Sequence, residues 1–446
     1  QSTLRRTFTM TNRSTQQPIF PVCKSRQIQV DFGGGQITSD GGSLLLRQAD
    51  RRLHLIDRVC KLLHDDRVKG RCDHRLSALV RQRVYALALG YEDLNDHETL
   101  RHDIAFQTAV ESNQPLASSS TLCRFENRAD RETAAAISGV MVDTFIASHR
   151  RPPKRLVLDF DATDDCVHGQ QEGRFFHGYY DQYCFLPLYV FCGSQLLVAY
   201  LRPSNIDPAR HAWAILNLLV KRLREVWPDV EIIFRGDSGF CRWRMLRWCD
   251  HHKVGYIVGL AKNSRINAIA AGLMDEAQER FEASGQKQRL FADVRYAALS
   301  WDRERRVIAK AEYSSLGSNP RYVVTNLTGD SAELYDQLYC ARGNMENRIK
   351  EQQLDLFSDR TSCHRWWPNQ FRLLLSSLAY LLIDAIRRLA LQGTQLAQAQ
   401  CGTIRLKLFK IGAVVLRNTR RVRVHLSNAF PYQPLFWLTA KRLALE

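Results

Sequence analysis

Several common signatures of catalysis and membrane anchoring are absent from this chain of 446 residues. No two of its 12 cysteines are spaced as C-x-x-C, and its 13 histidines form no H-E-x-x-H pair, so the usual zinc signatures are missing. No apolar run reaches the roughly 18–20 residues that a membrane span needs, and no secretory leader pattern is visible. We therefore expect a cytoplasmic protein with reduced thiols and no membrane partner.

Acidic residues are scarce relative to basic ones. There are 46 Asp and Glu against 63 Lys and Arg, which gives a formal net charge of +17 and a pI near 9.5. Such a balance favours a polyanionic partner, and nucleic acid is the first expectation. A membrane surface is the second, but no long amphipathic basic helix stands out. Hydrophobic residues make up 45% of the chain, so it should be globular, with two to four structural units for its length.

The pattern along the chain changes near residue 150. Residues 43–149 carry apolar side chains at steps of three and four, which predicts an all-helical region spanning 1–150. After Pro152 and Pro153, RLVLDFDAT, CFLPLYVFCG and QLLVAYL read as strands, the last two joined by a hairpin at Gly193–Ser194. Helices and strands then alternate, so residues 151–264 should form the first part of an α/β core with a mixed sheet.

Beyond Lys262 this alternation stops. Three β-like segments follow with no helix between them, and they predict a β insertion over 265–330. A helical pattern returns over 331–390, as the second part of the core. The remaining region, 391–446, is basic: from Cys401 onward nine Lys or Arg face one acidic residue, a net of +8, and AVVLRNTRRVRVHL predicts a hairpin.

Two aspartates end the first strand of the core. Asp159 and Asp161 are two residues apart and so face the same side of one strand. Placing two carboxylates together is costly unless a positive charge lies between them, and a cation would serve. A strand end open to solvent is the alternative.

A third aspartate lies in VEIIFRGDSGFCRW, where the strand ends at Asp237 between two glycines. The carboxyl ends of strands in α/β sheets are common ligand sites, although D-S-G is also an ordinary turn. The GDSG letters resemble a serine-protease loop. However, Ser238 would need a histidine and an acid to activate it, and Phe240 breaks the G-x-S-x-G pattern.

A glutamate on a later helix completes the set. At 100° per residue, one helix face collects a tyrosine, two cations, a carboxylate and an amide, namely Tyr339, Arg342, Glu346, Lys350 and Gln353. A solvated charged face is the ordinary interpretation of such a stripe. Together with two strand-end aspartates, Glu346 would instead allow two divalent metals to be held for in-line phosphoryl transfer. All-oxygen ligands suit Mg²⁺.

These residues resemble the DDE transposases of bacterial insertion sequences, and the closest match is the insertion sequence 1380 family, related to the insertion sequence 4 group. The likeness runs from about Val30 to the C-terminus. It is carried by LDFDATDD, RGDSGF and Y-x2-R-x3-E, with DGGSLLLRQAD, FHGYYDQYCFLPLYVF, LRPSN, RYVVTNL, YCARGNMENRIKEQQLDLFSDRTS and RRVRVHL in the same order.

The resemblance implies a ribonuclease H-like core interrupted by the β insertion. It implies that Asp161, Asp237 and Glu346 are the catalytic and metal-binding carboxylates, with Asp159 a weaker candidate for the first position. Two Mg²⁺ ions, replaceable by Mn²⁺, would be the cofactor. The helical region 1–150 would bind the terminal inverted repeats or mediate dimerisation, and the working complex would be a homodimer or larger.

Further residues take roles from the same resemblance. Tyr339 and Arg342 match its signature and would position phosphate or DNA. The lysine expected seven residues after the glutamate is Gln353 here, and Lys350, one turn earlier, is its proposed substitute. Trp301 in the insertion would stack on a flipped base, although packing within the protein is the favoured interpretation for it.

The function implied is cleavage of the element's ends and joining of the 3′-hydroxyls to target DNA. A metal-dependent nuclease without strand transfer, and a non-catalytic DNA-binding repressor of the element, remain alternatives. The presence of all three carboxylates disfavours the repressor.

Overall fold

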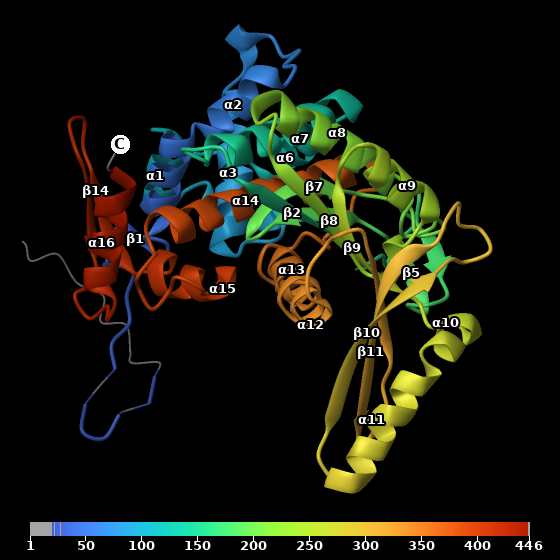
Figure 1. Cartoon of the computed structure of the whole chain (residues 1–446). Helices are drawn as coiled ribbons and strands as arrows, with labels where there is room; N and C mark the ends of the chain where they lie inside the picture. Colours follow the sequence, from blue (N-terminus) through green and yellow to red (C-terminus); the bar gives the residue numbers. More distant parts are fainter. Residues whose placement is uncertain (1–19, 22, 27, 445–446) are drawn as a thin grey trace, which may run out of the picture.

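The computed structural model describes residues 20–21, 23–26 and 28–444. A mixed sheet runs through its centre in the order β10-β11-β13-β9-β8-β2-β6-β7, with helices on both faces (Figure 1). The strands are β2 Arg155–Ala162, β6 Leu188–Cys192, β7 Gln195–Tyr200, β8 Glu231–Gly236, β9 Gly255–Leu260, β10 Gln288–Tyr296, β11 Arg305–Ser314 and β13 Arg321–Thr325. A short strand, β12 Gly317–Ser318, pairs with β11.

The strands of this sheet run in mixed directions. β2, β8 and β9 are parallel neighbours, whereas β6 is antiparallel to both β2 and β7. The predicted mixed sheet is therefore confirmed, as is the hairpin at Gly193–Ser194. The segment CFLPLYVFCG is not one strand but two, because it breaks at Pro187. Its first part is β5 Gln182–Phe185, which joins a small sheet with β3 Asp165–Cys166 and β4 Phe175–His177.

Alternation along β2 sends its side chains to two different layers. Leu158 and Phe160 enter a core formed with three helices, α7 Arg131–Ala147, α8 Ala212–Val226 and α9 Trp243–His251. Asp159 and Asp161 face the opposite layer. There the helical run of residues 331–355 covers Ile233 and Ile257 of the neighbouring strands.

That helical run is not uniformly α-helical. It passes from α12 Ser331–Glu333 through π-helical turns at Leu334–Tyr339 and a 3-10 turn at Cys340–Arg342 into α13 Gly343–Lys350, then into π-helical turns at Glu351–Asp355. Wider turns of this kind are rare and often occur at functional sites.

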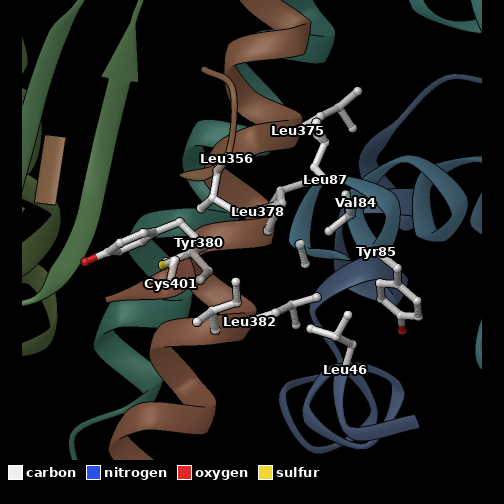
Figure 2. Packing of buried hydrophobic residues seen from close by; sticks show 14 of the residues in the cluster. Leu46, Val84, Tyr85, Leu87, Leu356, Leu375, Leu378, Tyr380, Leu382 and Cys401 are labelled. Carbon is white, nitrogen blue, oxygen red and sulfur yellow. The ribbon is translucent and has the colours of Figure 1, made fainter. Parts of the chain in front are cut away.

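The N-terminal helices share a core with a helix from the far end of the chain. They are α1 Ser43–Leu53, α2 Leu55–Leu62, α3 Leu76–Leu89, α4 His97–Leu100, α5 Ile104–Val110 and α6 Ser119–Glu126. The region before residue 150 is not all-helical as predicted, because a short strand at Ile37–Thr38 also lies in it. Leu46 of α1 and Leu87 of α3 pack with Leu382 of the buried helix α14 Trp366–Leu389 (Figure 2). One hydrophobic core thus spans the predicted boundaries at residues 150 and 390.

The inserted segment differs from the prediction of strands alone. It begins with α10 Ser264–Ile269 and α11 Ala271–Ser284, and its strands β10, β11 and β13 extend the central sheet through β9. Together they project from the body of the molecule (Figure 1). α11 carries Leu273, Ala277 and Phe281 at helical spacing, but only Ala277 is fully buried, and the prediction of strands alone overlooked this narrow apolar stripe.

The C-terminal region closes back on the start of the chain. It contains α15 Cys401–Ile404, π-helical turns at Arg405–Phe409, and the predicted hairpin as β14 Ala413–Arg417 and β15 Val422–Leu426, followed by α16 Gln433–Ala444. A short strand near the start, β1 Ile37–Thr38, pairs with β14. Within the described part of the chain, no helix is long and apolar enough to cross a membrane.

Candidate active site

The strands β2 and β8 bring two aspartates to one edge of the sheet. Their parallel register places Asp159 opposite Arg235. Asp161 and Asp237 each lie two residues further along the same two chains, so both stand at the carboxyl ends of neighbouring strands. Asp161 and Asp237 are separated by 237 − 161 = 76 residues, the same number that separates the paired residues Asp159 and Arg235. The two carboxylates are therefore at equivalent positions on the neighbouring chains.

Asp159 is engaged by a buried arginine. Nη2 of Arg235 lies 2.6 Å from Oδ2 of Asp159, and the same guanidinium also donates to the backbone carbonyl of Leu338. Burial raises the pKa of the Asp159 carboxyl and Arg235 opposes that shift. Asp159 is only 2% exposed, which excludes the solvated strand end. Its ion pair ties β2 and β8 to the helical run above them.

Asp161 is also buried, but its carboxylate faces Arg342. Nη2 of Arg342 donates to Oδ2 of Asp161 at 3.0 Å, and the backbone N–H of Ala162 donates to Oδ1. Burial raises the pKa of Asp161 to about 6, Arg342 lowers it, and the charge of Asp237 raises it. The influence of Asp237 on Asp161 reflects the proximity of the two carboxylates.

Asp237 begins a tight turn whose backbone packs against a glycine. Its Oδ1 accepts from the N–H of Gly239 at 2.8 Å, while its other oxygen is directed toward Arg342. Behind the turn lies Gly259 of β9. A Cβ at that position would be 2.6 Å from the hydroxyl of Tyr339, 2.9 Å from the backbone N of Ser238 and 3.2 Å from the carbonyl carbon of Asp237.

The guanidinium of Arg342 lies within reach of all three candidate carboxylates. It is 3.0 Å from Asp161, 3.9 Å from Asp237 and 2.8 Å from Glu346. Asp161 and Asp237 come from the sheet edge, whereas Arg342 and Glu346 lie one turn apart at the start of α13. The side chain of Glu346 is 50% exposed, so this side of the cluster is open to a substrate. The structure therefore brings together the three carboxylates singled out in the sequence.

Tyr339 is half-buried behind the cluster, with its hydroxyl against the Gly259 position of β9. Burial raises the pKa of its phenol, with Arg342 lowering it and Asp237 raising it. Its ring packs with that of Tyr335, with the centroids 5.5 Å apart.

The two candidates for the lysine position occupy different environments. Lys350 is exposed at the end of α13. Gln353 lies in the π-helical turns, where its Nε2 donates to the carbonyl of Asp164 at 2.8 Å and to Oδ1 of Asp165 at 3.1 Å. Gln353 therefore holds the loop that follows Asp161, and it does not share an open face with Lys350.

Trp301 is packed within the inserted segment. Its ring meets Tyr296 edge-on, with the centroids 5.4 Å apart, and the guanidinium of Arg305 lies 5.5 Å from its centroid. These contacts agree with the favoured interpretation that Trp301 packs within the protein.

Two residues of the site went unnoticed in the sequence. Arg235 precedes Asp237 by two positions and so faces the same side of its strand; a charge inside the apolar run EIIFRG was the available signal. Gly259 interrupts YIVGL in the same way, and an isolated glycine in a strand can mark a close approach of another backbone. Among the described residues, no histidine forms a hydrogen bond with Ser238, so nothing seen here activates that hydroxyl.

The carboxylates fit a hard divalent cation by their chemistry. Asp161, Asp237 and Glu346 offer only oxygen atoms, the ligands that Mg²⁺ prefers. Within the described ranges, no three Asp, Glu, His or Cys side chains are spaced as a ready-made metal site. In the cluster itself, Arg342 lies between the carboxylates. The arrangement gathers the negative charge that a cation requires and balances it with an arginine.

The chain resembles known proteins along most of its length. No curated protein matches it. Among solved structures, the chain is similar to a piggyBac transposase in a synaptic complex with hairpin DNA, at 12% identity and a TM-score of 0.42, covering 92% of this chain and 82% of that one. A family model described as transposase DDE domain group 1 matches residues 20–446. The chain therefore belongs to the family of DDE transposase domains.

Proposed function

We propose that this DDE transposase binds the terminal inverted repeats of its element, cleaves the ends and joins the 3′-hydroxyls to target DNA. The observation that carries the proposal is the meeting of Asp161, Asp237 and Glu346 around one guanidinium. Three carboxylates from two strand ends and one helix are what metal-assisted phosphoryl transfer needs. The formal net charge of +17 supplies attraction for DNA.

The sheet supports a ribonuclease H-like core within this proposal. Three antiparallel strands, β7, β6 and β2, are followed by β8 and β9 parallel to β2, and the candidate carboxylates lie at the edge where β2 and β8 end. We further infer that the chain belongs to the insertion sequence 1380 family, on the ordered segments described above. It would act in the bacterial cytoplasm as a dimer or larger assembly, with the N-terminal helices contacting the repeats.

Each residue of the cluster has a separate part. Asp161, Asp237 and Glu346 would hold Mg²⁺, or Mn²⁺ in its place, and a bound divalent ion would supply a polarised phosphate and an activated nucleophile. Arg342 is placed to bind a phosphate oxygen once its carboxylates are otherwise engaged, since a guanidinium pairs readily with phosphate. Asp159 and Arg235 keep the two strand ends in register.

The test is cleavage of DNA that carries the element's ends. We expect Asp237→Ala and Glu346→Ala to lose activity in Mg²⁺ by about a hundredfold or more, because each removes a ligand of the metal site. Lys221→Ala, an exposed charge on α8, is the matched control and should cleave normally. Full cleavage by either carboxylate variant would refute the assignment.

A nuclease without strand transfer would use the same three carboxylates. Pre-cut ends incubated with a supercoiled target separate the two functions, because only a transposase joins them to the target. Absence of joined product from an enzyme that cleaves would favour the nuclease.

A further inference from the structure

A cavity of about 1080 Å³ lies between α8 and α9, outside the carboxylate cluster. Its volume is slightly above the roughly 300–1,000 Å³ that small-molecule sites occupy. Three tryptophans line it, Trp213, Trp243 and Trp248, together with four arginines and three histidines. None of these side chains has a part in the function proposed above.

The position of the cavity follows from the strand directions. β7 and β2 are both antiparallel to β6, so they run the same way. α8 follows β7 and α9 follows β8, so both helices begin at the edge of the sheet that carries Asp161 and Asp237 (Figure 1). Pro208, in the turn before α8, is the nearest side chain to the Gly239 position beside Asp237 apart from Asp237 itself, 3.6 Å from a Cβ built there.

The charge of the cavity is strongly positive. Its single carboxylate, Asp207, is paired with Arg242 at 2.6 Å. Arg210, Arg244 and Arg247 form no ion pair with any described carboxylate, although many arginines of this chain do. These guanidinium groups lie on both sides of the cavity, Arg210 before α8 and the other two on α9, and they favour an anionic occupant.

The aromatic side chains offer flat surfaces beside these charges. Trp213 is 50% exposed on α8. The ring of Trp248 is stacked on His252, with the centroids 4.3 Å apart and 18° between the planes, and Arg244 lies 5.4 Å from the centroid of Trp243. Indole faces next to arginines are how proteins hold unpaired nucleotides, since bases stack on the rings and phosphates pair with the cations.

We propose that this cavity binds a segment of unpaired DNA adjacent to the strand being cut. The inference rests on the proposed function for the identity of the nucleic acid. Duplex DNA keeps its bases stacked on each other, so the indoles would gain contact only where the strands are separated. The lining of the cavity resumes at Arg242, 242 − 237 = 5 residues after Asp237 in the protein chain, so a DNA strand that leaves the Asp237 turn would reach the cavity there.

Binding measured without metal tests the site separately from catalysis. The probe is a fluorescein-labelled thymidine oligonucleotide of about ten nucleotides, titrated in EDTA and followed by anisotropy, with a duplex of the same length alongside. We expect Trp213→Ala to weaken single-strand binding about tenfold, the loss of one stacked base, and to leave duplex binding unchanged. Trp437→Ala, an exposed tryptophan on α16, is the matched control.

The contribution of the arginines to binding is measured separately, by the dependence of affinity on salt concentration. For the double variant Arg244→Gln and Arg247→Gln, the slope of log affinity against log salt should fall by about 1.4, because each single-strand phosphate contact contributes about 0.7. Lys221→Gln, an exposed charge further along α8 that does not line the cavity, should not change that slope.

Two results would overturn the proposal. One is single-strand affinity unchanged in Trp213→Ala, and the other is an equal loss for duplex and single strand, which would make the cavity a general phosphate surface. Because the assay contains no metal, its failure leaves the cleavage test of Asp237 and Glu346 intact. Failure of that cleavage test likewise leaves this binding result standing.

Discussion

Asp159 and Asp161 are neighbours on one face of β2, but they pair with different arginines and so have different roles. Asp159 is paired with Arg235, and both side chains are under a tenth exposed. Asp161 faces the open cluster through Arg342. Stability measurements should therefore separate two aspartates that activity measurements would not.

We predict that Asp159→Ala lowers the free energy of unfolding by about 3–5 kcal/mol, since it leaves the Arg235 charge buried without its partner. Asp161→Asn should change it by less than about 1 kcal/mol, because Arg342 keeps Glu346 as a partner. Urea unfolding of both variants provides the comparison. Equal destabilisation would mean that Asp159 and Asp161 have the same structural role.

A histidine far from the site should control the response of stability to acid. His97 is fully buried between Gln82 and Arg83, and burial together with the charge of Arg83 lowers its pKa to about 3. The unfolded chain takes up a proton near pH 6.5 and the folded chain does not. Stability is therefore complete above pH 6.5 and is lost as the pH falls from 6.5 toward 3.

The expected loss from His97 approaches about 1.4 kcal/mol for each pH unit below 6.5. His97→Gln should flatten the curve of unfolding free energy between about pH 6.5 and 4.5, within the range of those pKa values. His102→Gln, at an exposed position, serves as the control and should keep the slope. If His97→Gln kept it too, other groups would account for the acid sensitivity.

At the scale of elements, β9 acts as a support for the turn that holds Asp237. Gly259 leaves no room for a side chain between that turn and Tyr339. We predict that Gly259→Ala reduces DNA cleavage by about tenfold or more, because a shift near 1 Å at the reacting groups costs up to about a hundredfold. Cleavage rate and thermal unfolding should be measured on the same preparation.

The control for Gly259 is Gly272→Ala, on the projecting helix α11 with no atom within 4 Å of the added Cβ. It should cleave normally and unfold at the same temperature or slightly higher. Tyr339→Phe combined with Gly259→Ala should not restore activity, since the contact with the backbone of Ser238 remains. Full restoration would place the strain in the Tyr339 hydroxyl alone.

The elements that sequence patterns predicted share one property, which is a long run of buried apolar side chains. β2, β8 and α14 are of this kind, and Asp161 and Asp237 could be found because they stand at the ends of two such strands. The helix α11 was not predicted, because it packs mainly against the strands β10 and β11 and has a single fully buried residue, Ala277. The role of Gln353 escaped because its partners, Asp164 and Asp165, lie about 190 residues away in the sequence.

The helix that carries Glu346 was predicted with uniform α-helical spacing. Its π-helical turns after Lys350 change the angular order, so Gln353 reaches the loop after β2 while Lys350 remains in solvent. Periodicity alone cannot reveal where a helix widens, because the widening depends on contacts with distant segments.

At the scale of the whole molecule, the N-terminal helices and the central sheet are joined through α14. Its side chains enter the core of α1 and α3, while Gln370 bonds the backbone of β7 and Tyr380 that of the turn before it. The molecule should therefore lose both parts together when it unfolds.

A substitution at Gly42 would test whether the N-terminal helices and the central sheet unfold together. A Cβ there would lie 1.9 Å from the carbonyl oxygen of Leu408, where the start of α1 meets the C-terminal region. We predict that Gly42→Ala lowers the unfolding temperature in one cooperative transition, with hydrogen exchange accelerating in α3 and in β2 alike. Faster exchange confined to α1–α3 would show two independent units.

The pairing of β1 with β14 also means that the start of the chain cannot complete its contacts until the end of the chain has been synthesised. Thr38 is made first but pairs with Ala413, 413 − 38 = 375 residues later. While the ribosome works through the interval, the leucines of α3 have no α14 to cover them, and they remain available to chaperones. A chain that ends before α14 would leave these leucines uncovered, so we expect the N-terminal helices to fold stably only when the chain is made through to its C-terminal region.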